Sequence, residues 1–275
     1  MVNPGVEAVI KRDALKTLNE MVSHQETKDI MISENVIEAV SPLLSDKNAD
    51  VRREAVSLIG SFANSERGRQ KLPVAFKGMQ QQLTDEAPLV REIDAWALLR
   101  LSTSREGCEL ISANKLATNM VVAFIRYTNP ANFSKDLHKF FSYLLEAFIN
   151  ITEYDNGIIP TLGTGTIAAL RDILLPDYKN DFGIYLQRIQ EYALKLLGNI
   201  SVNHKGKDEC IKEKIIDASS PFLSSEILQE RIYAAFTIMS CAIHLEGKNQ
   251  IVGRLDNEGN PIIIQVLSTI EIVRN

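Results

Sequence analysis

The chain has 275 residues and a net charge of −5. A negative charge balance gives no general attraction to phosphate, which argues against nucleic acid as a partner. No run of about 18 apolar residues predicts a membrane span, and the N-terminus lacks the apolar core of a secretory signal. The three scattered cysteines, Cys108, Cys210 and Cys241, do not form a disulfide framework, so we expect a reducing, cytoplasmic setting.

Amphipathic helices are predicted along the whole chain, because apolar residues recur at three- and four-residue steps. The predicted helices cover Arg12–Val22, Ile30–Leu44, Val51–Asn64, Leu72–Leu83, Val90–Thr103, Leu116–Tyr127, Leu137–Thr152, Thr166–Leu175, Ile184–Ser201 and, with a turn at Gly247, Ile227–Val252. Pro42 is expected to bend or end its helix. Thr128–Asp136 and Asp177–Gly183 are insertions, which either extend a binding face or are surface loops.

A repeat is marked by glycines that follow the long helices. They are Gly68, Gly107, Gly157, Gly206 and Gly247, with Thr27 at the corresponding upstream position. Successive glycines are 39, 50, 49 and 41 residues apart, close to the period of about 40 to 47 in armadillo and HEAT arrays. We expect each glycine to let the backbone turn sharply. The sequence predicts an all-α fold, an armadillo/HEAT-type α-solenoid of about six repeats that forms one domain over residues 1–275.

One face of each long helix is the predicted protein-binding surface. Residues 7, 11 and 14 positions before each glycine share a helix face, and those 9 and 10 before it are predicted to be core. We expect the first set to line a concave groove that binds an extended segment or a helix of another protein; the alternative is an ordinary solvated face. The candidate protein-binding residues are Trp96, Arg100, Tyr143, Asn150, Tyr192, Lys195, Asn199, Tyr233 and Phe236.

Three arginines, Arg52, Arg91 and Arg231, lie 16 positions before their glycines. They could form a basic track, but salt bridges to neighbouring acidic residues such as Asp50 and Glu86 are the preferred interpretation.

The segment ALKLLGNIS, Ala193 to Ser201, with Asn150 and Asn199, resembles armadillo repeats. Nuclear-import adaptors of that superfamily pair Trp 11 and Asn 7 positions before the glycine. Here Trp96 shares its repeat with Arg100, and no repeat has the pair, so import-signal binding is disfavoured.

The chain also resembles the armadillo-repeat family of the ciliary radial spoke. The matching segments are Arg12 to Ala55, Ser104 to Gly107 and Ala242 to Ile251. The chain is shorter than that family and carries the two insertions. The resemblance implies a non-catalytic scaffold subunit of the axonemal radial spoke, in a cilium or flagellum, whose partners are other spoke proteins.

No pattern in the chain predicts catalysis, a cofactor or a small-molecule substrate. The histidines His24, His138, His204 and His244 are far apart, and His204 with Cys210 is a lone pair, so no metal site is predicted. The glycines of Thr161–Leu170 lack the Gly-Lys-Ser/Thr of a phosphate-binding loop, so helix capping by Thr164 or Thr166 is expected instead. A nucleophile elbow and a His-Glu-x-x-His pattern are also missing. We therefore predict that the chain is not an enzyme.

A scaffold in the radial spoke is the first functional hypothesis. The alternatives are a soluble armadillo adaptor that binds one extended peptide, or a regulatory subunit of an enzyme complex, by analogy of fold. A scaffold should expose apolar surface such as Asn260 to Leu267, whereas a free adaptor should have polar caps. Trp96, Tyr192 and Phe236 are expected to supply apolar contact area in the groove.

Overall fold

The structure is a computed structural model that describes residues 4–129, 131–132, 137–163, 165–176, 178, 183–255 and 259–274. Helices make up the regular structure of these residues, and the β-bridge of Leu255 with Pro261 is isolated. The chain clusters into two compact units. One holds the described residues up to 123 and those of 137–151, and the other holds those of 124–132 and from 152 onward. Both units consist of stacked helices, as the sequence predicts.

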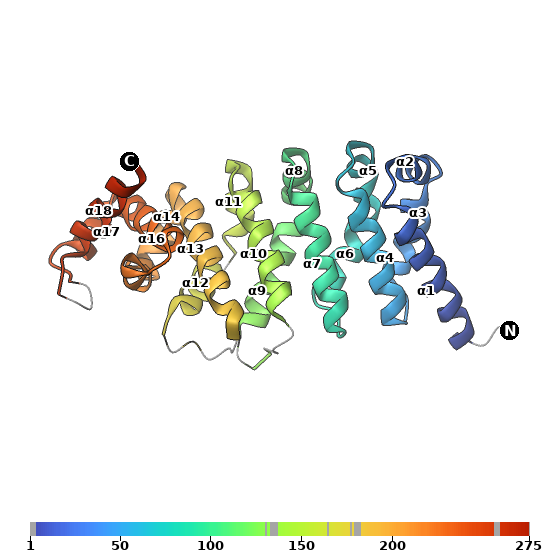
Figure 1. Cartoon of the computed structure of the whole chain (residues 1–275), viewed down its shortest axis with the longest axis horizontal. Helices are drawn as coiled ribbons and strands as arrows, with labels where there is room; N and C mark the ends of the chain where they lie inside the picture. The colour runs from blue at the N-terminus through green and yellow to red at the C-terminus, as the bar shows by residue number, and fades with distance from the viewer. Residues whose placement is uncertain are drawn as a thin grey trace. The chain divides into compact units, whose positions relative to one another are not determined.

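In chain order, a complete repeat has a short first helix, a second helix and a long third helix (Figure 1). A lone third helix comes before these repeats, and the last described helices are a first and a second helix. The first helices are α2 (Gln25–Ser33), α5 (Glu66–Lys71), α8 (Arg105–Ala113), α11 (Asp155–Thr161), α14 (His204–Lys212) and α17 (Leu245–Ile251). The second helices, several of which include a 3₁₀ turn, are α3 (Val36–Val40) with η1 (Ser41–Ser45), η2 (Leu72–Ala75) with α6 (Phe76–Gln82), α9 (Leu116–Thr128), α12 (Thr166–Leu174), α15 (Ile215–Ser219) with η5 (Ser220–Ser224), and α18 (Ile262–Arg274).

The third helices pack side by side within each unit, α1 with α4 and α4 with α7 in the first, and α13 with α16 in the second. These long helices are α1 (Pro4–Met21), α4 (Ala49–Phe62), α7 (Pro88–Ser102), α10 (His138–Thr152), α13 (Leu186–Val202) and α16 (Leu228–Cys241). A short 3₁₀ turn, η4 (Gly183–Tyr185), precedes α13.

The repeat glycines lie inside the first helices and not in turns, which corrects the expected role of glycine. Thr27 and every repeat glycine are the third residue of a first helix, and none of these glycines has a positive φ. A β-carbon at Gly68, Gly107, Gly206 or Gly247 would overlap the carbonyl oxygen of the residue six positions earlier, near the end of the preceding third helix. Glycine is needed at these four positions because the first helix approaches that carbonyl closely.

Short polar side chains start several first helices. The Ser65 and Ser104 hydroxyls accept hydrogen bonds from the backbone N–H groups of Gly68 (3.4 Å) and Gly107 (3.1 Å). The Asn203 side chain accepts one from Lys205 N–H at 3.0 Å in the same way. Such caps satisfy N–H groups that have no partner within the helix. They fix where each first helix begins, directly after the third helix.

Most predicted helix ends agree with the structure within a few residues, but Ile30–Leu44 is not one helix. It is divided among α2, α3 and η1, and the first break is at Asn35, whose φ of 59° is left-handed. Pro42 lies in the 3₁₀ turn η1, as expected for a residue without a backbone N–H. The helix predicted from Arg12 begins at Pro4, because proline is favoured in the first turn.

Part of each predicted insertion lies outside the described residues, namely positions 130 and 133–136 of the first and positions 177 and 179–182 of the second. Within the described part, the Tyr178 hydroxyl donates to the Thr128 carbonyl oxygen at 3.4 Å. The insertions therefore touch in the second unit. Whether they extend a binding face stays a prediction.

Among the described residues, no single helix is long and apolar enough to cross a membrane. Of the described helices, only α8 and α9 taken together reach that length and apolar composition, and these two helices are bent by 78° relative to each other.

Candidate protein-interaction surface

The candidate protein-binding residues all lie on third helices. Trp96 and Arg100 belong to α7, Tyr143 and Asn150 to α10, Tyr192, Lys195 and Asn199 to α13, and Tyr233 and Phe236 to α16. Phe236 is exposed and the others are half-buried. We call the third-helix positions 7, 11 and 14 residues before each repeat glycine the ladder face. The α7 and α10 members belong to the first unit, and the α13 and α16 members to the second.

The positions 9 and 10 residues before each glycine form the core, as predicted. Their side chains are at most 1% exposed. They are Leu58, Ile59, Ala97, Leu98, Ala147, Phe148, Leu196, Leu197, Thr237 and Ile238. The repeat register read from the sequence therefore identifies these core positions of the third helices correctly.

Polar residues of the ladder face also connect neighbouring repeats, a role that the sequence did not reveal. The Asn150 side-chain amide donates to Ser102 Oγ at 3.1 Å, and that of Asn199 donates to Thr152 Oγ1 at 3.2 Å. Ser240 Oγ donates to the Ser201 carbonyl oxygen at 2.7 Å. In each case a residue 7 positions before its repeat glycine donates a hydrogen bond to the residue 5 positions before the repeat glycine of the preceding repeat. Part of this surface is thus structural.

Two aromatic members of the ladder face, Trp96 and Tyr192, pack against arginine side chains. The Arg100 guanidinium lies 5.4 Å from the Trp96 ring centroid. Arg188 lies 5.2 Å from the Tyr192 ring and donates a 2.7 Å hydrogen bond to its hydroxyl. Such contacts hold large apolar rings in place at a partly exposed surface.

The pKa of Tyr233 is raised, chiefly because burial disfavours its charged form and further because Glu191 and Tyr192 lie nearby. Its hydroxyl therefore remains a hydrogen-bond donor over the neutral pH range.

The three arginines hold the loops before the third helices instead of forming a free basic track. Arg52 donates to both carboxylate oxygens of Asp85, each at 2.7 Å, and not to Asp50. The Nη1 atoms of Arg91 and Arg231 donate to the carbonyl oxygens of Asp85 and Ser225, both at 2.6 Å. The predicted salt bridges thus occur in part, with different acceptors from those expected.

An apolar groove of about 470 Å³ lies between α16, α17 and α18 in the second unit. Its lining is apolar apart from Lys248. Ile243, Ile263 and Leu267 of this groove are exposed to 67%, 54% and 56%. The predicted apolar segment Asn260–Leu267 thus presents apolar side chains at the surface, although Ile262 and Val266 are buried. An exposed apolar patch of this kind is typical of a protein-interaction site.

A second groove in the same unit, of about 700 Å³, has a mixed charge. Gly163 and Gly165 lie on one side of it, and Lys205, Asp208 and other charged residues of α14 on the other. Thr166 does not cap α12 as expected, because Gly165 is the N-cap residue and the Thr166 hydroxyl donates back to the Gly163 carbonyl oxygen. Thr164 lies outside the described residues.

The cysteines provide no exposed nucleophile. Cys108, Cys210 and Cys241 are free thiols and all are buried. The hydrogen bond with Cys241, and secondarily burial, raise the pKa of Cys210 well above its usual value. These thiols behave as small core side chains.

No protein-family model matches the chain, and no curated protein matches its sequence. Several solved structures do share its architecture. A designed armadillo repeat protein superposes with a TM-score of 0.67 at 17% identity, over 84% of this chain and 92% of the other. Another, solved in complex with the peptide (KR)4, gives a TM-score of 0.67 at 18% identity, over 88% of this chain and all of the other. The chain therefore has an armadillo-like repeat fold, and the predicted all-α solenoid is confirmed.

Proposed function

We propose that this chain is a non-catalytic protein-interaction solenoid that acts as a scaffold subunit of a larger assembly. The apolar groove between α16, α17 and α18 carries this proposal, because its lining is almost entirely apolar and includes strongly exposed isoleucine and leucine side chains. Burying such a surface against a partner contributes roughly 25 cal/mol per Å². A stable scaffold contact is the use that best fits this chemistry.

The ladder face supplies a second contact surface of different composition. In the first unit it presents half-buried Trp96 and Tyr143, and in the second unit half-buried Tyr192, beside arginine and asparagine side chains. Aromatic residues and arginine are enriched where protein partners bind most strongly. A scaffold with two such surfaces can hold two partners at once.

We further propose the radial spoke of the ciliary axoneme as this assembly, with other spoke proteins as partners. The sequence resemblance over Arg12 to Ala55 and Ala242 to Ile251 supports this placement. The second of these segments includes α17 and thus one wall of the apolar groove. On the same basis we propose the cytoplasmic interior of the cilium or flagellum as its location.

The test is to determine where a tagged copy of the protein is located in a ciliated cell and which proteins co-purify with it. We expect the tagged protein to stay with isolated axonemes after a high-salt wash and to co-purify with other spoke subunits. Ile243→Glu with Leu267→Glu should release it, because two charges would be placed in the apolar groove. Val122→Glu is the matched control, since Val122 is 55% exposed on α9 and does not line that groove. Retention of the double variant would contradict a contact at this groove.

A peptide-binding adaptor is the second candidate, favoured by the composition of the ladder face and by the fold it shares with an armadillo design solved with a bound peptide. Replacing Trp96, Tyr192 and Phe236 together by alanine should then abolish binding of the partner. The control is Val122→Ala with Tyr185→Ala, two exposed side chains off the ladder face. A freely soluble pool with one peptide-bearing partner would favour the adaptor over the scaffold, and intact binding by the triple variant would exclude the ladder face as the contact.

A further inference from the structure

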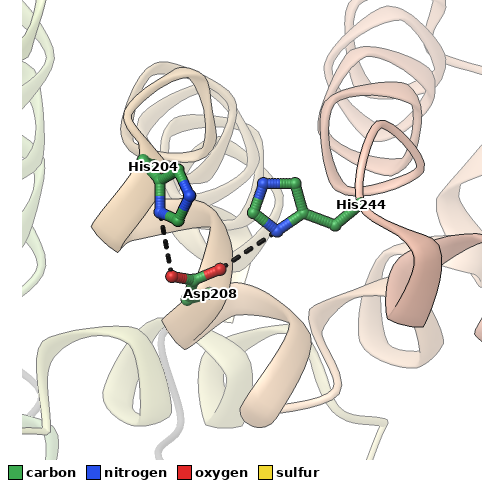
Figure 2. Close-up of side chains that lie close together, drawn as sticks. All are labelled: His204, Asp208 and His244. Atoms are coloured by element: carbon green, nitrogen blue, oxygen red, sulfur yellow. Dashed lines mark ion pairs between the residues drawn. The ribbon is translucent and has the colours of Figure 1, made fainter.

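Three potential metal ligands from two consecutive repeats meet at the surface of the second unit (Figure 2). His204 Nδ1 lies 3.0 Å from Asp208 Oδ2, and His244 Nδ1 lies 3.0 Å from Asp208 Oδ1. The two imidazole rings face each other edge to face, with centroids 4.9 Å apart. One ligand atom from each residue lies within 4.8 Å of the others. The carboxylate is therefore shared by both imidazoles.

The repeat brings these residues together although they are 40 positions apart in sequence. His204 is the first residue of α14, and Asp208 follows one helical turn later on the same face. His244 is the N-cap residue of α17, the next first helix. Gly206 and Gly247 hold these two helices close against the third helices before them. The close packing of both helix starts fixes the distance between the two histidines.

We propose that His204, Asp208 and His244 bind one divalent transition-metal ion, with Zn²⁺ as the reference case. Two imidazole nitrogens and one carboxylate oxygen form a ligand set that zinc accepts, with bonds of about 2.0 to 2.2 Å. Each imidazole nitrogen lies 3.0 Å from a carboxylate oxygen. At such bond lengths the two atoms can bind one ion if they move slightly apart, which widens the ligand–metal–ligand angle toward the tetrahedral value. Imidazole ligands favour zinc, copper, nickel and iron over magnesium and calcium.

The cluster is open enough for an ion to enter. The side chain of His204 is 78% exposed, that of Asp208 52% and that of His244 26%. Asp208 also lines the mixed-charge groove, so water or a side chain of another protein can supply the remaining ligands. A site with three protein ligands and an open fourth position is typical of exchangeable or catalytic zinc rather than of a closed structural site.

Binding would link one repeat to the next. The ion would join the start of α17 to the first two turns of α14, which otherwise meet here through ion-pair contacts with a single carboxylate. A ligand that binds only the folded state raises stability in proportion to the logarithm of its concentration. The site would thus make the stability of these repeats depend on the available metal.

The experiment measures metal binding to the whole purified chain, free of affinity tags, with ZnCl₂ and then CoCl₂ as the probes. Isothermal titration should show one equivalent bound, and Co²⁺ should give the visible absorption of a coordinated ion. Zinc should raise the unfolding temperature, and EDTA should reverse this. His204→Ala, Asp208→Asn and His244→Ala should each weaken zinc binding by roughly tenfold or more.

His24→Ala is the matched control. His24 is the N-cap residue of α2 and so holds the same place in its repeat as His244, but among the described residues it belongs to no such ligand cluster. Its removal should leave zinc binding unchanged. All four variants must keep the helical circular dichroism of the parent, since three of the positions are exposed and His244 is half-buried. Absence of zinc binding to the parent chain, equal loss in His24→Ala, or full binding in all three cluster variants would overturn the site and leave a hydrogen-bonded surface cluster.

Discussion

The indole ring of Trp96 lies across Gly60 of the preceding third helix, so closely that a β-carbon at Gly60 would be 2.7 Å from Cζ3 of the ring. Phe236 lies over Gly198 in the same manner, with Cδ1 3.0 Å from such a β-carbon. In both pairs the glycine is 8 positions before its repeat glycine, and the aromatic residue is 11 positions before the next one. The missing side chain leaves room for an aromatic ring of the ladder face.

Gly60→Ala is predicted to lower stability despite the better helix propensity of alanine. The new methyl group would overlap Trp96 and Ala97, and overpacking costs about 1 to 3 kcal/mol, against a propensity gain of about 1 kcal/mol. Gly198→Ala should be neutral or stabilising, since Phe236 is 43% exposed and its ring can shift. Thermal unfolding followed by circular dichroism measures both. Equal stabilisation by the two substitutions would show that the Trp96 ring is not held against Gly60.

The repeat register could be read from the sequence because it depends on spacing. The core positions 9 and 10 before each glycine, such as Leu58 and Ile59, are buried as predicted. The sequence predicts the positions of the repeat glycines correctly, but the reason for them is a close approach inside a helix and not a turn. A glycine that relieves a close approach inside a helix and one that permits a turn look alike in sequence, and only the distance to the preceding carbonyl distinguishes them.

Contacts between repeats could not be predicted in detail, because they depend on where side chains of different repeats meet. The sequence shows only that His204 and His244 hold similar positions in consecutive repeats. Nothing in it indicates that Asp208 lies between them. The hydrogen bond from Asn199 to Thr152 likewise joins helices of different repeats. A pattern that places a residue on a helix face does not determine which residue it contacts across the face.

Gly206→Ala is predicted to be among the most destabilising substitutions in the second unit. Its β-carbon would overlap the Ile200 carbonyl oxygen, and backbone atoms cannot move aside as a flexible side chain can, so we expect a loss of about 3 kcal/mol, the upper end for overpacking. Lys205→Ala, at the exposed neighbouring position, is the control and should change stability little. Urea unfolding compares the two. Similar midpoints for both variants would refute the close approach as the reason for glycine.

Asn199 is predicted to stabilise the stacking of repeats through its hydrogen bond to Thr152 Oγ1. Asn199→Ala should cost about 1 kcal/mol, the usual net value of one such bond. A double-mutant cycle with Thr152→Val isolates the pair, and we expect a coupling energy of roughly 0.5 to 1.5 kcal/mol. Additive effects of the two substitutions would mean that this hydrogen bond contributes nothing to stability.

Asp94 is predicted to make the protein less stable as the pH rises. Its side chain is fully buried on α7, and neither carboxylate oxygen has a hydrogen-bond partner among the described residues. Burial, and secondarily the charge of Asp85, raises the pKa of Asp94 well above its ordinary value. The folded state therefore retains a proton that the unfolded chain loses near pH 4. Stability falls from about that pH upward until the folded-state pKa is passed.

Asp94→Asn tests this prediction, because asparagine has nearly the same shape and does not ionise. The variant and the parent should unfold at similar temperatures below about pH 4, where both side chains are neutral. The variant should become progressively more stable than the parent as the pH rises, by about 1.4 kcal/mol per pH unit within the window. The difference between the two curves cancels the contribution of every other carboxylate. Parallel curves over pH 3 to 8 would show that Asp94 ionises normally in the folded state, which would require a partner for its buried charge.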